Sequence, residues 1–313
     1  MKVCIIGNGL VSLTLASVLI KKNIFVDILL TNKNNKYNQF RTLGISRSNI
    51  DYFNNQIVNI KKIIWEIRNI KIFTERDSKR EILAFDNKNE QIFSIIKNYQ
   101  LQKLLIKKLK NNKFVKYKKN FSIRDIKKKN RYNLVINCDP NNLLTKSFFS
   151  KKIVKDYKSY AYVTTIIHKK TKNDIAFQNF TKNGPIAFLP ISKTETSVVF
   201  SLRSIKKKND SEMNDLVKKF NPNYSIKNIN KWDSFKLRSS NLRTYHKDNI
   251  LAFGDLLHKI HPLAGQGFNM SLRDIKLLSD LIEEKINLGL DLDNSLCEEF
   301  QNKVQDKNYI SLQ

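Results

Sequence analysis

Cysteine is scarce in this 313-residue sequence, in which Cys4, Cys138 and Cys297 lie far apart. Their odd number and wide spacing exclude a disulfide framework and a cysteine-based zinc site, which favours a reducing compartment. Long apolar runs are also missing, and none approaches the roughly 18–20 residues that cross a bilayer. The apolar start is interrupted by Gly7-Asn8-Gly9, and no small-residue cleavage site follows, so we expect no signal peptide. The sequence predicts a cytoplasmic protein, soluble or peripheral to the inner membrane.

Acidic residues are few: 28 Asp and Glu face 57 Lys and Arg, which gives a formal net charge of +29. Such an excess has three interpretations: binding of nucleic acid, attraction to an anionic membrane, or compositional drift that also enriches Asn and Ile. The lysine runs 127–129 and 206–208 are scattered between apolar segments, as solvated faces are. This pattern favours drift, keeps membrane contact open and argues against nucleic acid.

The order of apolar and polar segments predicts a folded α/β protein. Hydrophobic residues make up 41% of the chain, enough for a sizeable core, and no internal repeat is visible. A strand at 3–6, a glycine turn, a helix at 10–22 and a strand at 24–30 match the opening of a dinucleotide-binding βαβ unit. Further expected elements are helices at 99–110, at 206–220 and from about 269, strands at 134–136 and 250–253, and a mostly β segment at 157–203.

The first motif is Gly7-Asn8-Gly9-Leu10-Val11-Ser12. Glycines let the backbone approach a pyrophosphate, and the following helix start offers unpaired N–H groups. Ser12 replaces the third glycine of the pattern but is small enough for close helix–strand packing. The acid that would hold a ribose hydroxyl after the second strand is absent, because Leu30 and Thr31 stand there. An ordinary strand–helix turn is the alternative interpretation.

The second motif spans residues 250–274, where an apolar strand leads into Gly254-Asp255. A carboxylate at that place can accept a hydrogen bond from a polyol hydroxyl. Pro262 stiffens the next turn, and Gly265-Gln266-Gly267 lets the backbone lie against a flat ligand. The helix that follows points its positive N-terminal end at the same place, which would stabilise the charge of a reduced flavin.

The four histidines do not form a metal site in our interpretation. His258 and His261 lie three residues apart, but no carboxylate or cysteine completes a ligand set around them. We expect His168 and His246 to be surface or loop residues. No Ser-His-Asp grouping stands out either, so the sequence names no catalytic side chain.

The second motif resembles the second FAD motif of the flavin-dependent aromatic hydroxylases. Two further stretches are similar to segments of the ubiquinone-biosynthesis hydroxylases: Arg41 to Ser48, and Phe177 to Pro190 with its Asn183-Gly184-Pro185 turn. The resemblance covers most of residues 1–310 in the family's order. It implies an α/β fold of the p-hydroxybenzoate hydroxylase type, with a dinucleotide-binding FAD domain and an inserted β-rich substrate domain.

The same resemblance implies an FAD-dependent monooxygenase that uses O2 and NAD(P)H to hydroxylate a polyprenylated phenol or quinol in ubiquinone biosynthesis. The flavin carries the chemistry in such enzymes. Expected partners are a lipid-like aromatic substrate, a membrane surface and other ubiquinone-biosynthesis proteins, but no nucleic acid and no metal. The residues assigned to FAD are Gly7, Gly9, Ser12, Arg41, Asp255, Pro262, Gly265, Gln266, Gly267 and Asn269.

The resemblance also predicts how the chain divides into domains. Residues 1–60 would form the FAD-binding βαβ part and 61–100 substrate-domain strands. Residues 101–150 would continue the FAD domain, 151–240 would form the β-rich substrate domain, and 241–313 a C-terminal FAD-binding part with a helix.

Three departures from the family pattern keep other interpretations open. The first is Ser12 together with the missing acid after the second strand. At Asp139-Pro140 the family has Asp-Gly, so the binding of FAD pyrophosphate and of the nicotinamide donor is in question. The chain also ends at Gln313 without a helix stop signal, which is consistent with truncation. The alternatives are a degenerate or truncated FAD-binding protein without hydroxylase activity, and a nicotinamide-dependent oxidoreductase without flavin.

Overall fold

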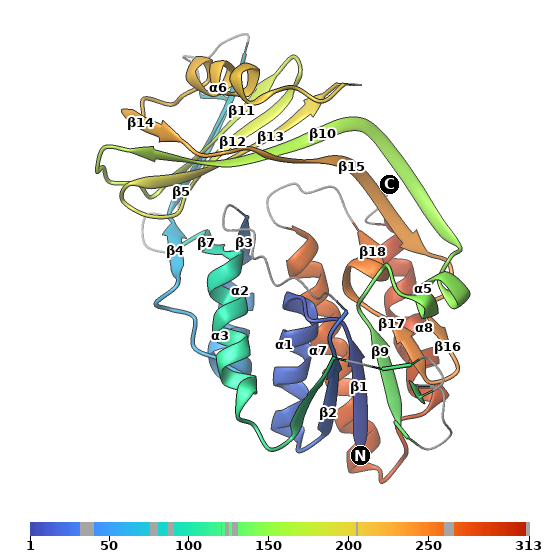
Figure 1. Cartoon of the computed structure of the whole chain (residues 1–313). Coiled ribbons are helices and arrows are strands. Elements are labelled where there is room, and N and C mark those ends of the chain that lie inside the picture. The colour runs from blue at the N-terminus through green and yellow to red at the C-terminus, as the bar shows by residue number, and fades with distance from the viewer. Residues whose placement is uncertain are drawn as a thin grey trace.

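The computed structural model describes residues 1–31, 41–75, 81–86, 91–119, 121–122, 125–126, 131–204, 206–259 and 266–310. They form two lobes, with a six-stranded sheet and its helices in one and a nine-stranded sheet in the other (Figure 1). A three-stranded sheet lies between them. Among the described helices, none is long and apolar enough to span a bilayer.

The six-stranded sheet has the strand order β16-β17-β9-β1-β2-β8. The predicted strand–helix–strand opening is confirmed, because the buried helix α1 connects β1 to β2 along the chain and the two strands pair in parallel. β9 pairs with the other edge of β1, and β17 pairs with β9. Burial on both faces explains why these strands are nearly continuous apolar runs. The bounds are β1 (Lys2–Ile6), α1 (Leu10–Leu19), β2 (Phe25–Leu29), β8 (Val115–Lys118), β9 (Leu134–Asn137), β16 (His246–Lys247) and β17 (Ile250–Ala252).

Helices pack against this sheet and against one another. α1 contacts both α3 (Asn98–Lys110) and α7 (Gln266–Asn287), and α7 contacts α8 (Asn294–Ile310). The predicted helix at 99–110 is confirmed, and it buries Leu101, Leu105 and Leu109 on one face. α7 starts at Gln266, earlier than the expected Asn269. The shorter helices are α2 (Arg47–Tyr52), α5 (Leu143–Phe148), η1 (Ile20–Lys22), η2 (Phe53–Ile57) and η3 (Gly254–Leu256).

The nine-stranded sheet confirms the predicted β segment. Its order is β18-β15-β10-β13-β12-β11-β5-β6, and β14 pairs with β10. The glycine of the Asn183-Gly184-Pro185 turn is required there, because Gly184 has φ +127° and an added Cβ would lie 1.9 Å from the Ser201 carbonyl oxygen. The bounds are β5 (Asn69–Thr74), β6 (Leu83–Asp86), β10 (Lys152–His168), β11 (Ile175–Thr181), β12 (Gly184–Pro190), β13 (Glu195–Arg203), β14 (Ile226–Ile229), β15 (Asp233–Leu242) and β18 (His258–Lys259).

Helix α6 (Asp210–Lys219) covers one face of this sheet and buries Met213 and Val217 against Tyr162 and Phe200. It begins four residues later than the predicted helix at 206–220. The reason is the capping residue Asn209, which accepts a hydrogen bond from the Glu212 backbone N–H at 2.9 Å. Such a capping box fixes the first turn and leaves the preceding lysines outside the helix.

The three-stranded sheet has the order β3-β7-β4, with β3 (Thr42–Ser46), β4 (Ile64–Ile67) and β7 (Phe93–Lys97). Two polar contacts join it to the large sheet: Thr42 Oγ1 donates to Ser197 Oγ at 2.9 Å, and Lys97 Nζ lies 2.7 Å from Glu195 Oε2. Segment 61–100 contributes β4 and β7 to this sheet and β5 and β6 to the nine-stranded sheet. The predicted domain boundaries stay a prediction.

The prediction that His168 is a surface or loop residue is wrong, whereas His246 is half-buried in an edge strand of the six-stranded sheet. His168 is a buried residue of β10, and His246 lies in β16. The His168 ring lies 3.0 Å from Thr196 Oγ1 and 2.8 Å from the Lys169 carbonyl oxygen, and it lies beside Tyr224. Neighbouring lysines suggested exposure, but strand alternation turns this side chain inward.

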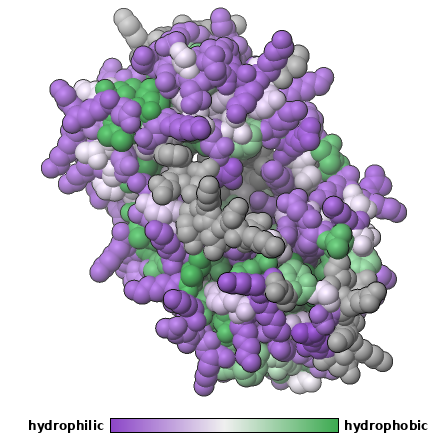
Figure 2. Space-filling view, in the orientation of Figure 1, coloured by the Kyte–Doolittle hydropathy of each residue, from purple (hydrophilic) through white to green (hydrophobic). Residues whose placement is uncertain are grey.

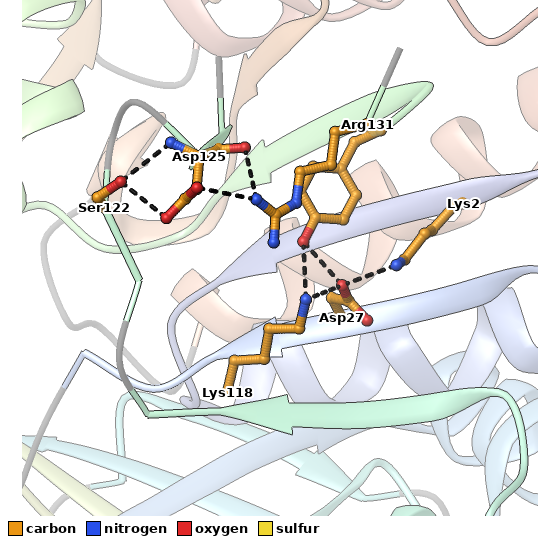
Figure 3. A network of polar contacts seen from close by, with 7 residues as sticks. Lys2, Asp27, Lys118, Ser122, Asp125 and Arg131 are labelled. Carbon is orange, nitrogen blue, oxygen red and sulfur yellow. Dashed lines mark hydrogen bonds and ion pairs between the residues drawn. The ribbon is translucent and has the colours of Figure 1, made fainter. Parts of the chain in front are cut away.

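A buried carboxylate anchors the six-stranded sheet (Figure 3). Asp27 Oδ2 accepts hydrogen bonds from Lys118 Nζ at 2.7 Å and Tyr132 Oη at 2.7 Å, and Lys2 Nζ lies 3.1 Å away. Burial alone would raise the pKa of Asp27, but the contacts with Lys118, Tyr132 and Lys2 outweigh it and hold the pKa below its usual value. The ionised form therefore stabilises the fold.

We predict that Asp27→Asn lowers the free energy of unfolding by about 2–3 kcal/mol at neutral pH, because the partly exposed lysines lose their buried partner. The folded-state pKa lies below the unfolded value of about 3.9, so this contribution is complete above that value and is lost as the pH falls through the folded-state pKa. Urea unfolding of both forms at pH 7 and under acidic conditions checks this. Asp125→Asn, which breaks the more exposed pair with Arg131, is the control; equal losses in both variants would contradict the prediction.

Candidate cofactor site

Three loops meet at one edge of the six-stranded sheet, where β1, β9 and β17 end. Strand pairing brings them together: the Cys138 N–H donates to the Ile6 carbonyl, and the Phe253 N–H donates to the Asn137 carbonyl, each at 2.9 Å. The carboxyl edge of a parallel sheet is the usual place for a ligand in this fold class. The first motif, the Asp139 element and the second motif thus lie side by side although they are far apart in the sequence.

Gly7 and Gly9 have different roles in the first loop. Gly7 has φ +112°, and an added Cβ would lie 3.3 Å from Ser12 Oγ and 3.6 Å from Cys138 Cβ. Gly9 has φ −75° at the start of α1, and an added Cβ would meet nothing within 4 Å. Gly9, the N-cap residue of α1, has no side chain that could accept from the first N–H groups of the helix. Gly7 lets the loop pack closely, and Gly9 leaves room for an anionic ligand.

The second motif begins in contact with the first. Gly254 has φ +63°, and an added Cβ would lie 3.1 Å from Val11 Cγ1, so η3 packs tightly on α1. The next residue, Asp255, is exposed. Its carboxylate is therefore available to a polyol hydroxyl at the same edge as Gly9.

Cys138 lies between these loops as a neutral thiol. Burial raises the pKa of Cys138 to about 12, and the charges of Asp255 and Asp139 add to the rise, while a hydrogen bond with Ser12 opposes it. Because the thiolate is the nucleophilic form, the raised pKa disfavours a nucleophilic role for Cys138.

The Asp139-Pro140 element forms a turn that satisfies its own polar groups. The Asp139 carbonyl accepts from Thr145 Oγ1 at 2.7 Å and from Asn142 Nδ2 at 3.0 Å, and Asn142 caps α5. Pro140 is exposed and has no N–H to donate. This side of the edge thus offers a ligand fewer backbone donors than a glycine would.

Arg41 points toward the large sheet. Its Nη2 lies 3.3 Å from Asp233 Oδ2, and the guanidinium lies over the Phe235 ring at 5.3 Å. The side chain thus joins β15 to the start of β3 and is half exposed. A direct contact of Arg41 with FAD stays a prediction.

The start of α7 carries the remaining predicted residues. Pro262 and Gly265 lie outside the described residues, whereas Gln266 and Gly267 form the first turn of the helix. The Asn269 side chain donates to the Gly44 carbonyl at 2.8 Å and accepts from Asn49 Nδ2 at 2.7 Å. This carboxamide therefore fastens α7 to β3, a role that the sequence pattern did not reveal.

Two further residues complete the picture of this edge. Asp27 is the acid of β2, but its carboxylate is committed to the lysine network, so it does not replace the missing ribose acid. Gln102 of α3 donates to the Asn8 carbonyl at 3.3 Å and so supports the glycine loop. No pattern in the sequence pointed to Gln102, since a polar side chain on an amphipathic helix usually faces solvent.

The chain matches a family described as "FAD binding domain" over residues 150–288. It is 28% identical over 142 residues to the ubiquinone hydroxylase UbiL of Rhodospirillum rubrum, covering 43% of this chain and 33% of that protein. It is also 30% identical over 139 residues to the 3-demethoxyubiquinol 3-hydroxylase of Escherichia coli, covering 42% and 36%. Over these stretches the chain is similar to curated hydroxylases of ubiquinone biosynthesis. The matched part spans less than half the length of these curated relatives.

Solved structures agree with this relationship at the level of the fold. PqsL of Pseudomonas aeruginosa, in complex with 2-aminobenzoylacetate, superimposes with a TM-score of 0.75 at 14% identity and covers 100% of this chain and 94% of that one. An oxygenase of 2-methyl-3-hydroxypyridine-5-carboxylic acid gives a TM-score of 0.75 at 11% identity, with coverage of 98% and 88%. The predicted fold of this chain is confirmed as that of the p-hydroxybenzoate hydroxylase type.

Gly9 offers a direct test of the site. We predict that Gly9→Ala leaves the free energy of unfolding within about 1 kcal/mol of the parent, because the methyl group meets no protein atom within 4 Å. The same methyl enters the space open to a pyrophosphate, so FAD affinity should fall about tenfold or more. Fluorescence titration of the apoprotein with FAD measures the affinity.

Gly289→Ala is the control for this test. Gly289 has φ +68° and open space around it, so alanine strains the backbone there but leaves the sheet edge intact. We expect unchanged FAD affinity in that variant. If Gly9→Ala also bound FAD like the parent, Gly9 would have no place in the cofactor site.

Proposed function

We propose that this chain is an FAD-dependent monooxygenase that hydroxylates the aromatic ring of a polyprenylated phenol or quinol in ubiquinone biosynthesis, using O2 and NAD(P)H. The observation that carries the proposal is the convergence of the open α1 start at Gly9 and the exposed Asp255 on one sheet edge. The relatives' names point to the same chemistry.

The residues at the edge fit FAD in type and placement. The α1 start would bind the pyrophosphate through backbone N–H groups, with Gly7 and Gly9 permitting close approach. Asp255 would accept a hydrogen bond from a ribityl hydroxyl. Gly267, in the first turn of α7, would let the helix start lie against the ring, where its positive end favours the reduced, anionic state. Bound FAD would supply the redox and oxygen chemistry, and the protein would supply position and electrostatics.

The face of the large sheet toward the three-stranded sheet suits an aromatic substrate. Ser197 lies on this face, because its hydroxyl accepts a hydrogen bond from Thr42 of β3. Two residues along β13, Val199 lies on the same face, and its cross-strand partners are Ala187 on β12 and Val163 on β10. Such small and apolar side chains leave room for a flat ring and exclude water around it. We assign the substrate's ring to this face.

The two alternatives have less support. A nicotinamide-dependent oxidoreductase without flavin would leave the second motif and the FAD-domain match over residues 150–288 without a role. A degenerate FAD-binding protein is favoured by one observation, the closed turn at Asp139-Pro140.

Product analysis tests the hydroxylase assignment. We expect expression of this chain to restore the missing hydroxylated product in one of a set of strains that each lack a single ubiquinone hydroxylase. The Asp255→Ala variant, produced at the same level, should fail in that strain. If the soluble, FAD-loaded protein restored no strain, the degenerate alternative would replace the hydroxylase.

We further propose that the chain docks on an anionic membrane, where a polyprenylated substrate resides. The net charge is +29, and α3 presents Lys103, Lys107 and Lys110 as an exposed stripe opposite its buried leucines. The face in Figure 2 is mostly hydrophilic with small separated apolar areas, which suits electrostatic attraction better than insertion.

Liposome flotation checks the docking proposal. We expect binding to vesicles containing phosphatidylglycerol at low salt, weak binding to phosphatidylcholine alone, and release as salt screens the charges. A Lys103, Lys107 and Lys110 triple change to Gln should reduce the binding more than Lys170→Gln, which removes an exposed lysine elsewhere. Equal flotation with both lipids would leave compositional drift as the source of the charge.

A further inference from the structure

A buried hydrogen-bonded pair, His258 and Asp274, joins β18 to α7 next to the candidate cofactor site. His258 Nε2 lies 2.5 Å from Asp274 Oδ2, and both side chains are almost completely buried. The other carboxylate oxygen, Asp274 Oδ1, accepts from Arg273 Nη2 at 2.9 Å and Nε at 3.1 Å. Burying a polar or charged group is costly unless it is hydrogen-bonded. The removal of either partner would therefore leave the other buried without this hydrogen bond.

The pair links three parts of the molecule. His258 follows η3 by two residues, so it lies close in the chain to Asp255. Its backbone pairs with Asn241 of β15, and the Leu242 N–H donates to the Leu257 carbonyl at 3.0 Å. Through Asp274 the same residue reaches α7, which also contacts η3. His258 therefore connects the large sheet, the Asp255 turn and the helix that starts at Gln266.

The opposite side of α7 is held by a second set of contacts. Asn269 bonds to Gly44 and Asn49, and Lys276 Nζ donates to Asn49 Oδ1 at 2.9 Å. At 3.6 residues per turn, Asp274 lies about 140° around the helix from Asn269, whereas Lys276 lies within about 20° of it. The first half of α7 is thus held by hydrogen bonds on two sides.

We propose that His258 and Asp274 are positioning residues for the cofactor: together they fix the start of α7 against the Asp255 turn, so that both reach the same bound FAD. The inference rests on the proposed function and extends it to residues that touch no ligand themselves. Arg273 holds the carboxylate in its orientation. No step of the reaction is assigned to the imidazole.

The experiment compares FAD affinity and the flavin midpoint potential in variants of the full chain. His258→Ala should raise the FAD dissociation constant about tenfold or more, the effect of losing one buried charge-assisted hydrogen bond. The midpoint potential should become more negative, because the positive start of α7 is held less firmly against the reduced ring. His258→Gln keeps an N–H donor at a similar reach and should recover most of the FAD affinity and of the midpoint potential. Asp274→Asn should give values of both between those of the parent and of His258→Ala.

His168→Ala is the matched control. It removes another buried, hydrogen-bonded imidazole, but one at the end of β10 that pairs with β14, away from β18 and α7. Both alanine variants should lower the melting temperature, and all titrations are made well below it. Only the His258 and Asp274 variants should change the FAD affinity and the potential.

The outcomes separate this inference from the proposed function. If the parent chain binds no FAD, the proposed function fails and the positioning role fails with it. If the parent binds FAD, and His258→Ala shows the parent's affinity and potential, the positioning role alone is overturned. A shift of the same size in His168→Ala would also overturn it, because general loss of stability would then explain the effect.

Discussion

Parallel pairing of β9 with β1 on one side and with β17 on the other is the constraint on which the site depends. It brings loops from the start, the middle and the end of the chain to one sheet edge. Gly254 tightens this arrangement by letting η3 pack against Val11 of α1. The glycines and the exposed Asp255 then lie within reach of one extended ligand. A shift in strand order would separate the two motifs and remove the site.

The helices and the outer sheets stabilise that edge from several directions. Asn269 ties α7 to β3, the His258–Asp274 pair ties it to β18, and Gln102 supports the glycine loop from α3. Asp27 performs a similar task on the sheet itself, where its ionised carboxylate gathers lysines from two strands. Buried polar groups in this lobe thus connect neighbouring elements by hydrogen bonds. Apolar packing alone would orient these elements less specifically.

Much of the fold could be predicted from the sequence because its signals are local. The apolar strand before Gly7 and the leucine spacing at 101–109 are set by period and turn chemistry alone. What the sequence could not give are contacts between distant segments. The inward turn of His168 and the pairing of His258 with Asp274 depend on tertiary neighbours, and the role of Asn269 as a fastener does too.

The central claim is that FAD binds at the edge formed by Gly9 and Asp255, and a fluorescence titration of the apoprotein with FAD tests it most directly. The parent chain should bind one FAD with saturable quenching. Asp255→Ala should bind about tenfold more weakly or worse, because it loses a hydrogen bond to a charged group of about 1.5–3 kcal/mol. Equal affinity of the two proteins, or no binding by the parent, would contradict this account.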